Sequence, residues 1–384
     1  MKIVHVISEF SAHEAMGRTI AEVVARVPGE HVLVTVRVHD GADRFARVHE
    51  VGGSLALFAL QKSGAIAEVL EAEQPDVVHL HGGALTAAWA LSPALRSAPM
   101  VHTVYGWPRL PRLRQWRLAT VGQMRRSNVL RARVAVTSLL RPRLARLMLR
   151  ISNTSSVLTP DGDALQRLSS SRVPVRRLPS GAALDPRRAE WRDEAPVVVF
   201  AGRAEMVRGV DVLLRAFPVV RSEVPGARLR LLLIPTADLP DVLAAVDASG
   251  LGDAVEVVTD PVADLAAELA AAQLGVWPFK FDYTTSPPAM AVAEAMAVGL
   301  PVVSTDVTCV RAIAQDGDNA VLVAPGDHRR LAGAIVQVLS DEFRWTGLAD
   351  AGRRTVQFDA SWEAAASVTG DSYRERIAVT KERS

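Results

Sequence analysis

Strand signals and helix signals alternate along almost the whole chain of 384 residues, and this alternation limits the folds that are open to it. Short runs of β-branched and other apolar residues, such as Val197–Phe200, are followed by segments with helical spacing. That order predicts parallel β-sheets covered by helices, the α/β class. An apolar fraction of 49% fits a well-packed protein of this class and excludes a disordered chain.

The expected elements can be placed by residue. In the first half we expect strands at Lys2–Ile7, His31–Val38, Asp76–His81, Met100–Val104 and Ser155–Leu158, and helices at Met16–Val27, Leu55–Ala72, Ala84–Leu95 and Leu113–Leu149. Within the last of these, Val134–Thr137 fits a strand equally well. In the second half we expect strands at Val197–Phe200, Arg228–Ile234, Val255–Val258, Gly275–Trp277, Val302–Ser304 and Val321–Val323, and a final helix at Ala360–Glu375.

The chain is long enough for two domains of ordinary size. The regular pattern breaks into Pro, Gly and charged residues around 181–195, which indicates a linker between them. We therefore predict an N-terminal domain over 1–185, a C-terminal domain over 195–358, and a terminal helix and tail over 359–384.

Charge is distributed unevenly along the chain. Thirteen arginines and no acidic residue lie between Asp76 and Asp161, although the whole chain has a net charge of only +2. Within this stretch, apolar residues recur at helical spacing beside the arginines, at Leu140, Leu144, Leu147 and Ile151. The Arg109–Arg150 region is therefore either an anionic membrane surface contact, or a site for a phosphorylated acceptor, or a core-facing helix with solvated arginines.

Composition excludes several other classes of protein. Cys309 is the only cysteine, so an internal disulfide and a cysteine-based metal cluster are excluded, and a reducing cytosol is expected. No run of residues is long and apolar enough to suggest a transmembrane span. Few aromatic residues are interleaved with the basic ones, which argues against nucleic acid as a partner. We expect a cytoplasmic protein, peripheral to the membrane if the basic stretch binds lipid.

Two arginines follow the strand Val197–Phe200. The strand ends in Gly202-Arg203, and Arg208 comes five residues after Arg203, just before an amphipathic helix. A strand, a turn with two cations and a helix make an anion site at the carboxyl edge of a parallel sheet. Because a guanidinium can bind phosphate through two parallel hydrogen bonds, the spacing suits a diphosphate.

One carboxylate stands in an otherwise apolar helical stretch near residue 294. Ser286 and two prolines read as the start of this helix, Glu294 is its one charge, Gly299 closes it, and Pro301 starts the next strand. A charge on a helix that is apolar all round is costly unless it meets a partner or a ligand. We therefore take Glu294 as a candidate binding residue; an ordinary ion pair is the alternative.

These two segments resemble the Gly-Arg…Lys-Gly element and the second half of the Glu-x7-Glu signature of the family 4 retaining glycosyltransferases, which have the GT-B fold. The resemblance covers essentially the whole chain and is strongest over about 196–336. It implies two Rossmann-like domains that face a central cleft, with a C-terminal helix that crosses back to the first domain. It also implies a nucleotide-diphosphate sugar as donor, bound by the second domain.

Carried across position by position, the resemblance assigns roles in donor binding. Arg203 and Arg208 would grip the diphosphate and act in catalysis by stabilising the leaving group, and Glu294 would bind the ribose hydroxyls. The remaining donor-binding candidates are Gly17, Gly202, Ser286, Ala289 and Met290, the last two through backbone N–H groups at the helix start.

The first domain would hold the acceptor, which could be a glycan, a lipid or a small metabolite. His81 matches a family strand that ends in His, and Tyr105 stands where most members have a histidine. His102 cannot replace that histidine, because side chains alternate along a strand and His102 points to the opposite face. Ser286 stands where most members have the first Glu of the pair, and a helix cap is the alternative role for it.

No metal or other cofactor is expected, because two arginines can neutralise the diphosphate. Asp161-Gly162-Asp163 could pass for a metal-binding Asp-x-Asp, but its position favours a helix cap. The expected activity is transfer of a hexose-like sugar to an acceptor hydroxyl with retention. The alternatives are an inactive GT-B protein that binds donor as a partner subunit, and a nucleotide-sugar 2-epimerase.

Overall fold

Two parallel β-sheets, one in each of two units, make up the framework of the computed structural model. The model describes residues 1–52, 63–83, 99–106, 114–127, 144, 147, 154–168, 173–179, 181–193, 195–282 and 284–381. Unit 1 comprises Met1–Arg109, Val134–Gly181 and Trp362–Ser384, and unit 2 comprises Leu110–Arg133 and Ala182–Ser361. The chain thus enters unit 2 twice, for 110–133 and again after Gly181, and returns to unit 1 at Trp362.

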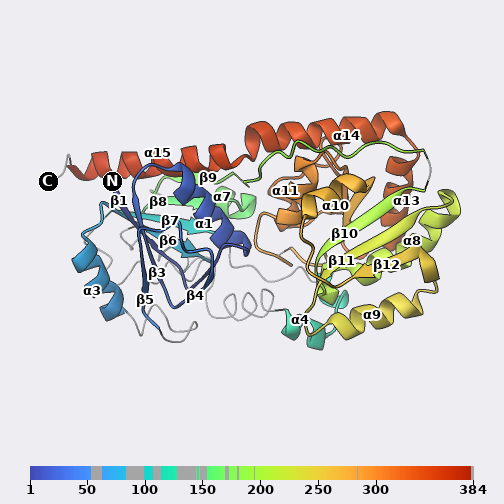
Figure 1. Cartoon of the computed structure of the whole chain (residues 1–384), viewed down its shortest axis with the longest axis horizontal. Coiled ribbons are helices and arrows are strands. Elements are labelled where there is room, and N and C mark those ends of the chain that lie inside the picture. The colour runs from blue at the N-terminus through green and yellow to red at the C-terminus, as the bar shows by residue number, and fades with distance from the viewer. Residues whose placement is uncertain are drawn as a thin grey trace. The chain divides into compact units, whose positions relative to one another are not determined.

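Unit 1 has a seven-stranded sheet whose strand order is β5-β3-β1-β6-β7-β8-β9 (Figure 1). Its strands are β1 (Lys2–Val6), β3 (Glu30–Thr35), β5 (Arg47–Glu50), β6 (Val77–Gly82), β7 (Met100–Val104), β8 (Thr154–Thr159) and β9 (Val175–Arg177). Every neighbouring pair is parallel. A separate parallel pair is formed by β2 (Glu9–Ser11) and β4 (Arg37–Asp40), so the strand expected at 31–38 divides between two sheets.

The two faces of this sheet differ in chemistry. On one face, side chains of β1, β3, β6 and β7 form an apolar cluster with Ile66 and Leu70 of helix α3 (Ser63–Glu73). The other face carries His5, His79 and Thr103, and Tyr373 of helix α15 (Trp362–Lys381) hydrogen-bonds His79 there. Polar side chains are therefore concentrated on the α15 side of the sheet.

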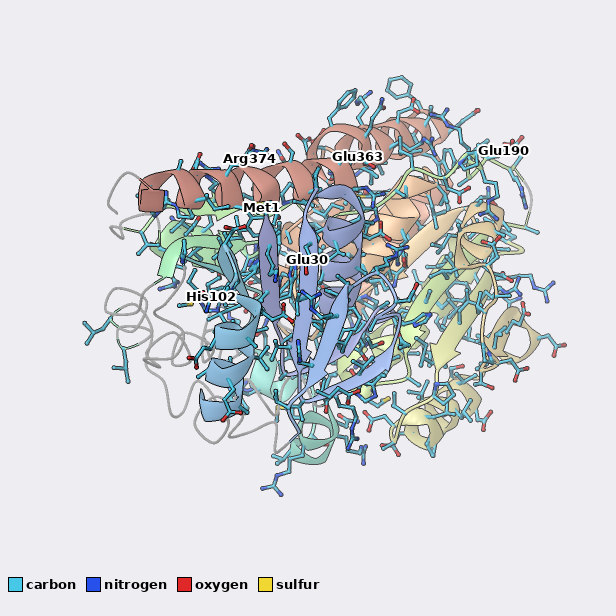
Figure 2. All side chains as sticks on the ribbon, turned by 60° about the vertical axis from the view of Figure 1, so that its left-hand side comes forward. Met1, Glu30, His102, Glu190, Glu363 and Arg374 are labelled. Carbon is cyan, nitrogen blue, oxygen red and sulfur yellow. The ribbon has the colours of Figure 1, made fainter. Side chains whose placement is uncertain are left out.

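Helix α15 packs against helix α1 (Ala15–Arg26) and strands β6, β7 and β8 within unit 1 (Figure 1). Arg26 of α1 donates to Glu363 of α15 over 3.0 Å, and Glu363 is labelled in Figure 2. Trp362 lies where a Cβ on Gly181 would stand, at 2.0 Å, so Gly181, with φ +65°, accommodates the start of this helix. The expected return of the C-terminal helix to the first domain is confirmed.

Unit 2 has a six-stranded parallel sheet in the order β12-β11-β10-β13-β14-β15. Its strands are β10 (Val197–Arg203), β11 (Arg228–Ile234), β12 (Val255–Val258), β13 (Leu274–Trp277), β14 (Val302–Thr305) and β15 (Val321–Val323). Its longer helices are α8 (Val210–Glu223), α9 (Leu239–Ala248), α10 (Leu265–Ala271), α11 (Met290–Ala297), α13 (His328–Leu339) and α14 (Glu342–Arg354). The α/β fold class is confirmed in both units.

The helix expected over 113–149 is not continuous in the part that the structure describes. A 3-10 turn at Gln115–Arg117 is followed by a separate short helix, α4 (Val121–Arg126). Thr120 starts α4 through a capping box with Gln123, so a residue assigned to the interior of a long helix is an N-cap. Described residues 114–127 belong to unit 2, not to the first domain where the sequence placed them. The helix expected at 84–95 lies outside the described residues.

Candidate functional site

Strand β10 delivers two arginines to the carboxyl edge of the unit 2 sheet. Gly202 and Arg203 are its last residues, and Arg208 ends the following 3-10 turn, Met206–Arg208. Between them, the Glu205 carboxylate accepts from Arg203 Nε through one oxygen and from Arg208 Nε through the other, each at 3.3 Å. We call Arg203 and Arg208, bridged by Glu205, the guanidinium pair. The sequence predicted its two arginines but not its carboxylate.

The members of the guanidinium pair differ in their exposure. The Arg203 side chain is 42% exposed, whereas those of Arg208 and Glu205 are only 13% and 7% exposed. Burial lowers the pKa of Arg208, and the Glu205 carboxylate opposes that shift. Glu205 engages only the Nε atom of each arginine, so it does not occupy the terminal nitrogens, which can bind an anion. A diphosphate would therefore meet Arg208 in a water-poor setting, where electrostatic attraction is strongest.

A neighbouring loop fixes the turn that carries Arg208. Gly209 has φ +85°, and a Cβ at this position would lie 1.9 Å from the Pro278 carbonyl oxygen. Lys280 donates its backbone N–H to the Val207 carbonyl at 3.2 Å and its ammonium lies 2.7 Å from Asp211 on α8. Lys280 is fully buried, and sequence reasoning missed it, because only the fold brings it to Asp211.

The segment 114–127 supports the same turn from another side. Met124 of α4 packs against Val207 and Phe281 in a small apolar cluster. Arg126 pairs with the buried Asp238, which also accepts from the backbone N–H of Met206 at 3.0 Å. A residue from the N-terminal half of the sequence thus helps to position the turn of the guanidinium pair.

Helix α11 begins later than the sequence suggested. Its first residue is Met290 and its N-cap is Ala289, so Ser286 is not its cap and that interpretation was wrong. The residue before a proline is held away from the helical conformation, and the successive prolines Pro287 and Pro288 delay the start. The role expected for the Ala289 amide is also corrected, because this N–H donates to the Cys309 carbonyl at 3.0 Å.

Glu294 lies half-buried on α11 among buried alanine, valine and methionine side chains. The helix closes as expected. Gly299, with φ +70°, donates to the Met296 carbonyl, and Leu300 donates to the Ala295 carbonyl. Helix α11 and the guanidinium pair both follow the carboxyl ends of neighbouring strands, β13 and β10. The two sequence motifs therefore share one edge of the sheet, where ligands bind in open α/β folds.

In unit 1, Gly17 lies in the first turn of α1, and a Cβ there would stand 2.0 Å from the Ser11 carbonyl oxygen. Close packing of α1 on β2 is therefore a sufficient reason for this glycine.

His81 is the penultimate residue of β6, and Tyr105 follows β7 with its N–H donated to the Gly82 carbonyl at 2.9 Å. Burial raises the pKa of the Tyr105 phenol well above its usual range, so this side chain is a neutral group.

Strand register confirms the predicted orientation of His102. It lies opposite Leu80, a member of the apolar cluster on the α3 side, whereas Thr103 lies opposite His81. His102 therefore cannot take the place of the histidine that Tyr105 replaces.

Asp161 is confirmed as a helix cap, because its Oδ1 accepts from the N–H groups of Asp163 and Ala164 at the start of α7 (Gly162–Leu168).

Among the described residues, His5, His79 and His81 lie close enough together to be tested as metal ligands. Both ring nitrogens of His79 are already engaged, Nδ1 with the Tyr373 hydroxyl at 2.6 Å and Nε2 with the Thr103 hydroxyl at 2.7 Å. Both nitrogens of His5 are engaged by other imidazoles. An ion would have to displace these hydrogen bonds, so the donor set does not fit a metal.

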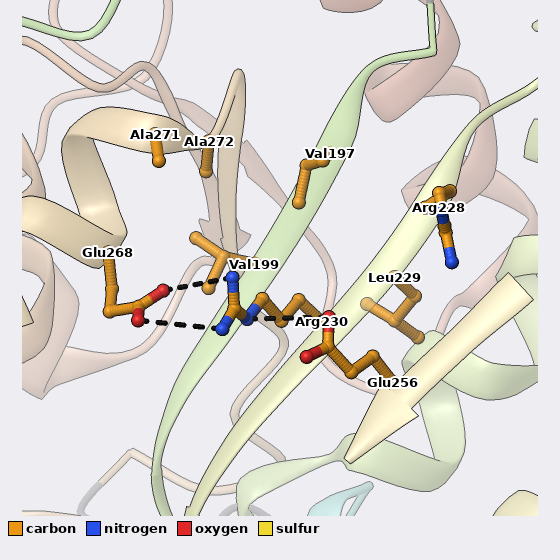
Figure 3. Close-up of a pocket in the computed structure, with 9 residues that line it drawn as sticks. All are labelled: Val197, Val199, Arg228, Leu229, Arg230, Glu256, Glu268, Ala271 and Ala272. Atoms are coloured by element: carbon orange, nitrogen blue, oxygen red, sulfur yellow. Dashed lines mark hydrogen bonds and ion pairs between the residues drawn. The ribbon is translucent and has the colours of Figure 1, made fainter. Parts of the chain in front are cut away.

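A pocket of about 160 Å³ lies elsewhere in unit 2 (Figure 3). Its lining includes Val197 and Arg228, the first residues of β10 and β11, so it lies toward the amino ends of these strands. Arg230 crosses it and pairs with Glu268 at 3.1 Å and Glu256 at 3.5 Å (Figure 3). The charge of Arg230 is neutralised by these two carboxylates of the pocket, and the pocket is at the opposite end of β10 from the guanidinium pair.

The fold and this edge define a two-unit α/β protein with two arginines, bridged by one carboxylate, at the carboxyl end of a central strand of its C-terminal sheet. The family model described as "Glycosyltransferase Family 4" matches residues 16–184, and the one described as "Glycosyl transferases group 1" matches residues 195–341. The chain belongs to this family of glycosyltransferases, group 1 or family 4, with the GT-B fold.

The curated relatives include D-inositol 3-phosphate glycosyltransferases from several organisms. That of Nocardioides sp. is 34% identical over 208 residues, which is 50% of this chain and 44% of the relative. That of Thermobispora bispora is 30% identical over 209 residues, 52% of this chain and 47% of the relative. The matches thus span about half the length of these relatives.

Solved structures share the fold over nearly the full chain. Sucrose-phosphate synthase from Thermosynechococcus elongatus has a TM-score of 0.75 at 20% identity and covers 99% of this chain and 100% of its own. Anabaena HepE, solved in complex with UDP and glucose, has a TM-score of 0.70 at 15% identity and covers 98% of this chain and 100% of its own.

In the parts of this chain that the structure describes, no helix has the length and hydrophobicity needed to cross a bilayer.

Proposed function

We propose that this protein is a retaining glycosyltransferase that transfers a sugar from a nucleotide-diphosphate donor to an acceptor hydroxyl without a metal ion. The observation that carries the proposal is the guanidinium pair, two arginines held by one carboxylate at the carboxyl end of β10. Family membership supports it, and so does the binding of UDP by HepE, a protein of the same fold.

Arg203 and Arg208 bind the donor diphosphate in this proposal. The bond between the sugar and the diphosphate breaks as the acceptor oxygen attacks, and negative charge grows on the departing diphosphate. Two preorganised cations stabilise that charge more than they stabilise the intact donor, which lowers the barrier. They also supply the positive charge that a divalent ion would otherwise supply, and this is why we propose a metal-independent reaction.

The other candidates bind the rest of the two substrates. Glu294 accepts hydrogen bonds from the ribose hydroxyls, and the N–H of Met290, in the first turn of α11, contacts phosphate. Gly17, Gly202 and Ser286 contribute to the donor site. His81 and Tyr105 belong to the acceptor site of unit 1, and a hydroxyl-bearing glycan, lipid or small metabolite is the acceptor.

Nucleotide binding and turnover test the proposal together. UDP, GDP, TDP and ADP are screened by thermal shift, with UDP expected to give the largest stabilisation. UDP-glucose is then assayed with D-inositol 3-phosphate as the first acceptor, because relatives are named for it. Arg203→Ala and Arg208→Ala should abolish the UDP shift, while the control Arg221→Ala, an exposed residue on α8, should not.

Three outcomes separate the alternatives. Transfer that requires Arg203 and Arg208 supports the proposal. Nucleotide binding without turnover on any sugar donor and cell-extract acceptor favours the inactive partner protein, and conversion of the donor sugar without an acceptor favours the epimerase. Full activity after exhaustive dialysis against EDTA is expected, and loss that a divalent ion restores would refute metal independence.

We further propose that unit 1 contacts an anionic membrane surface. Leu144 and Leu147 are 45% and 50% exposed, so these two residues do not face a core as the alternative interpretation requires. They lie in the acid-free, arginine-rich stretch. Co-sedimentation with vesicles should be strong for phosphatidylglycerol and weak for phosphatidylcholine, and the double variant Leu144→Ser with Leu147→Ser should reduce it. Equal binding to both lipids would contradict this proposal.

A further inference from the structure

Three buried imidazoles stand side by side across the unit 1 sheet. His31 of β3, His5 of β1 and His81 of β6 are 4%, 0% and 4% exposed. His5 Nε2 lies 2.9 Å from His31 Nδ1, and His5 Nδ1 lies 3.1 Å from His81 Nε2. The ring planes stack at 28° and 19°. We call these three residues the imidazole relay.

The relay has one fixed direction of donation. His31 Nε2 lies 2.8 Å from the Val27 carbonyl oxygen, which can only accept, so this nitrogen carries the proton. In a neutral ring His31 Nδ1 is then an acceptor, and His5 Nε2–H donates to it. His5 Nδ1 is in turn an acceptor, and His81 Nε2–H donates to that. Burial lowers the pKa of each ring, to about 3 for His81, which keeps all three neutral.

The last atom of the relay, His81 Nδ1, therefore carries no proton and presents a lone pair, so it is a hydrogen-bond acceptor. Among the described residues this atom is buried and has no hydrogen-bond partner. A buried acceptor without a partner costs about 1–3 kcal/mol, so natural proteins rarely keep one without a use. His81 stands at the carboxyl end of β6, the sheet edge at which α/β proteins bind ligands.

We propose that His81 Nδ1 binds a hydroxyl group of the glycosyl acceptor and that His5 and His31 are positioning residues that fix the His81 tautomer. This inference rests on the proposed function. A fixed lone pair attracts an O–H donor and repels phosphate and carboxylate oxygens. The relay therefore selects an uncharged hydroxyl at this point of the acceptor, and places any anionic group of the acceptor elsewhere.

The tautomer can be measured directly in the full chain. Two-bond ¹⁵N–¹H spectra of protein labelled at histidine show which ring nitrogen carries the proton. In the wild type, His81 should be protonated at Nε2. His31→Gln should preserve this state, because its amide can donate to Val27 and its carbonyl can accept from His5. His31→Leu removes the acceptor for His5 and should give a mixture of His81 tautomers.

Kinetics supply the second readout, with UDP-glucose and D-inositol 3-phosphate as the probe pair. His31→Leu should raise the acceptor KM about five- to tenfold, the loss of one hydrogen bond, and leave the donor KM unchanged. His31→Gln should restore it. His102→Leu, on the other face of the sheet, is the control for a buried histidine and should change neither tautomer nor KM.

A wild-type His81 protonated at Nδ1 would overturn the inference, and so would a His31→Leu variant whose tautomer and acceptor KM match the wild type. Because the wild-type spectrum requires no variant, poor folding of His31→Leu leaves the test intact. Failure to bind any nucleotide would instead refute the proposed function, and the spectrum decides the relay separately.

Discussion

The two candidate sites of this protein use titratable groups in opposite ways. In unit 2 the guanidinium pair keeps its charge at a partly buried position, because Glu205 bridges both arginines. In unit 1 a layer of histidines is kept neutral by burial, which lowers the pKa of His81 and His102 to about 3. Eight of the nine histidines fall within the first 102 residues, and only His328 lies in unit 2. The comparison teaches that ion pairing retains charge in unit 2 and burial removes it in unit 1, which fits the anionic ligand that we propose for the first site and the hydroxyl that we propose for the second.

The largest expected effect comes from removing charge in unit 2. Arg208→Ala should lower kcat/KM for the nucleotide sugar about 10²–10³-fold, the range found for removing one preorganised donor to a developing anion. Arg203→Ala should cost less, because Arg203 is more exposed and its field is screened. Arg208→Lys should keep part of the activity. Steady-state kinetics measure the loss of kcat/KM in each variant. Equal losses in Arg203→Ala and Arg208→Ala would contradict the argument from their difference in burial.

Glu205→Gln tests whether the carboxylate holds the pair together. Removing one partner of a buried ion pair leaves an uncompensated charge, and we expect about 3 kcal/mol lower stability. Bound UDP supplies the missing negative charge, so the thermal shift caused by UDP should be larger in Glu205→Gln than in the wild type. A smaller shift would mean that Glu205 does not compete with the diphosphate for the two arginines.

Lowering the pH should destabilise unit 1 before it destabilises unit 2. The native pKa of His81 and of His102 is about 3, and the unfolded value is near 6.5, so between these pH values the unfolded chain binds protons that the native chain does not. The unfolding free energy of unit 1 should therefore fall as the pH is lowered through this window, by up to about 1.4 kcal/mol per pH unit for each histidine. Hydrogen exchange resolved by segment between pH 7 and pH 4 measures it. Equal acid sensitivity in the two units would contradict this account.

Much of unit 2 could be predicted from local sequence. Strand β10 ending in Gly-Arg and the glycine that closes α11 depend on propensity and backbone conformation, and both are found where the sequence placed them. The orientation of His102 followed from the alternation of side chains along β7. The start of α11 was misplaced, because a serine before two prolines fits a cap and an extended segment equally well.

The remaining features depend on which strands become neighbours. Glu205 is a solvated acid until the turn folds both arginines onto it, and the partner of Lys280, Asp211, is distant in sequence. The imidazole relay needs the order β3-β1-β6, which brings together residues 31, 5 and 81. Spacing along one chain segment cannot give that order, so the family resemblance at His81 indicated a site in unit 1 but not its hydrogen bonds.

A crystal structure of the protein with UDP tests the central claim most directly. The account predicts that the diphosphate oxygens lie within hydrogen-bonding distance of the terminal nitrogens of both Arg203 and Arg208, with the ribose hydroxyls on Glu294. A diphosphate bound away from both guanidinium groups, at any other place on the molecule, would contradict it.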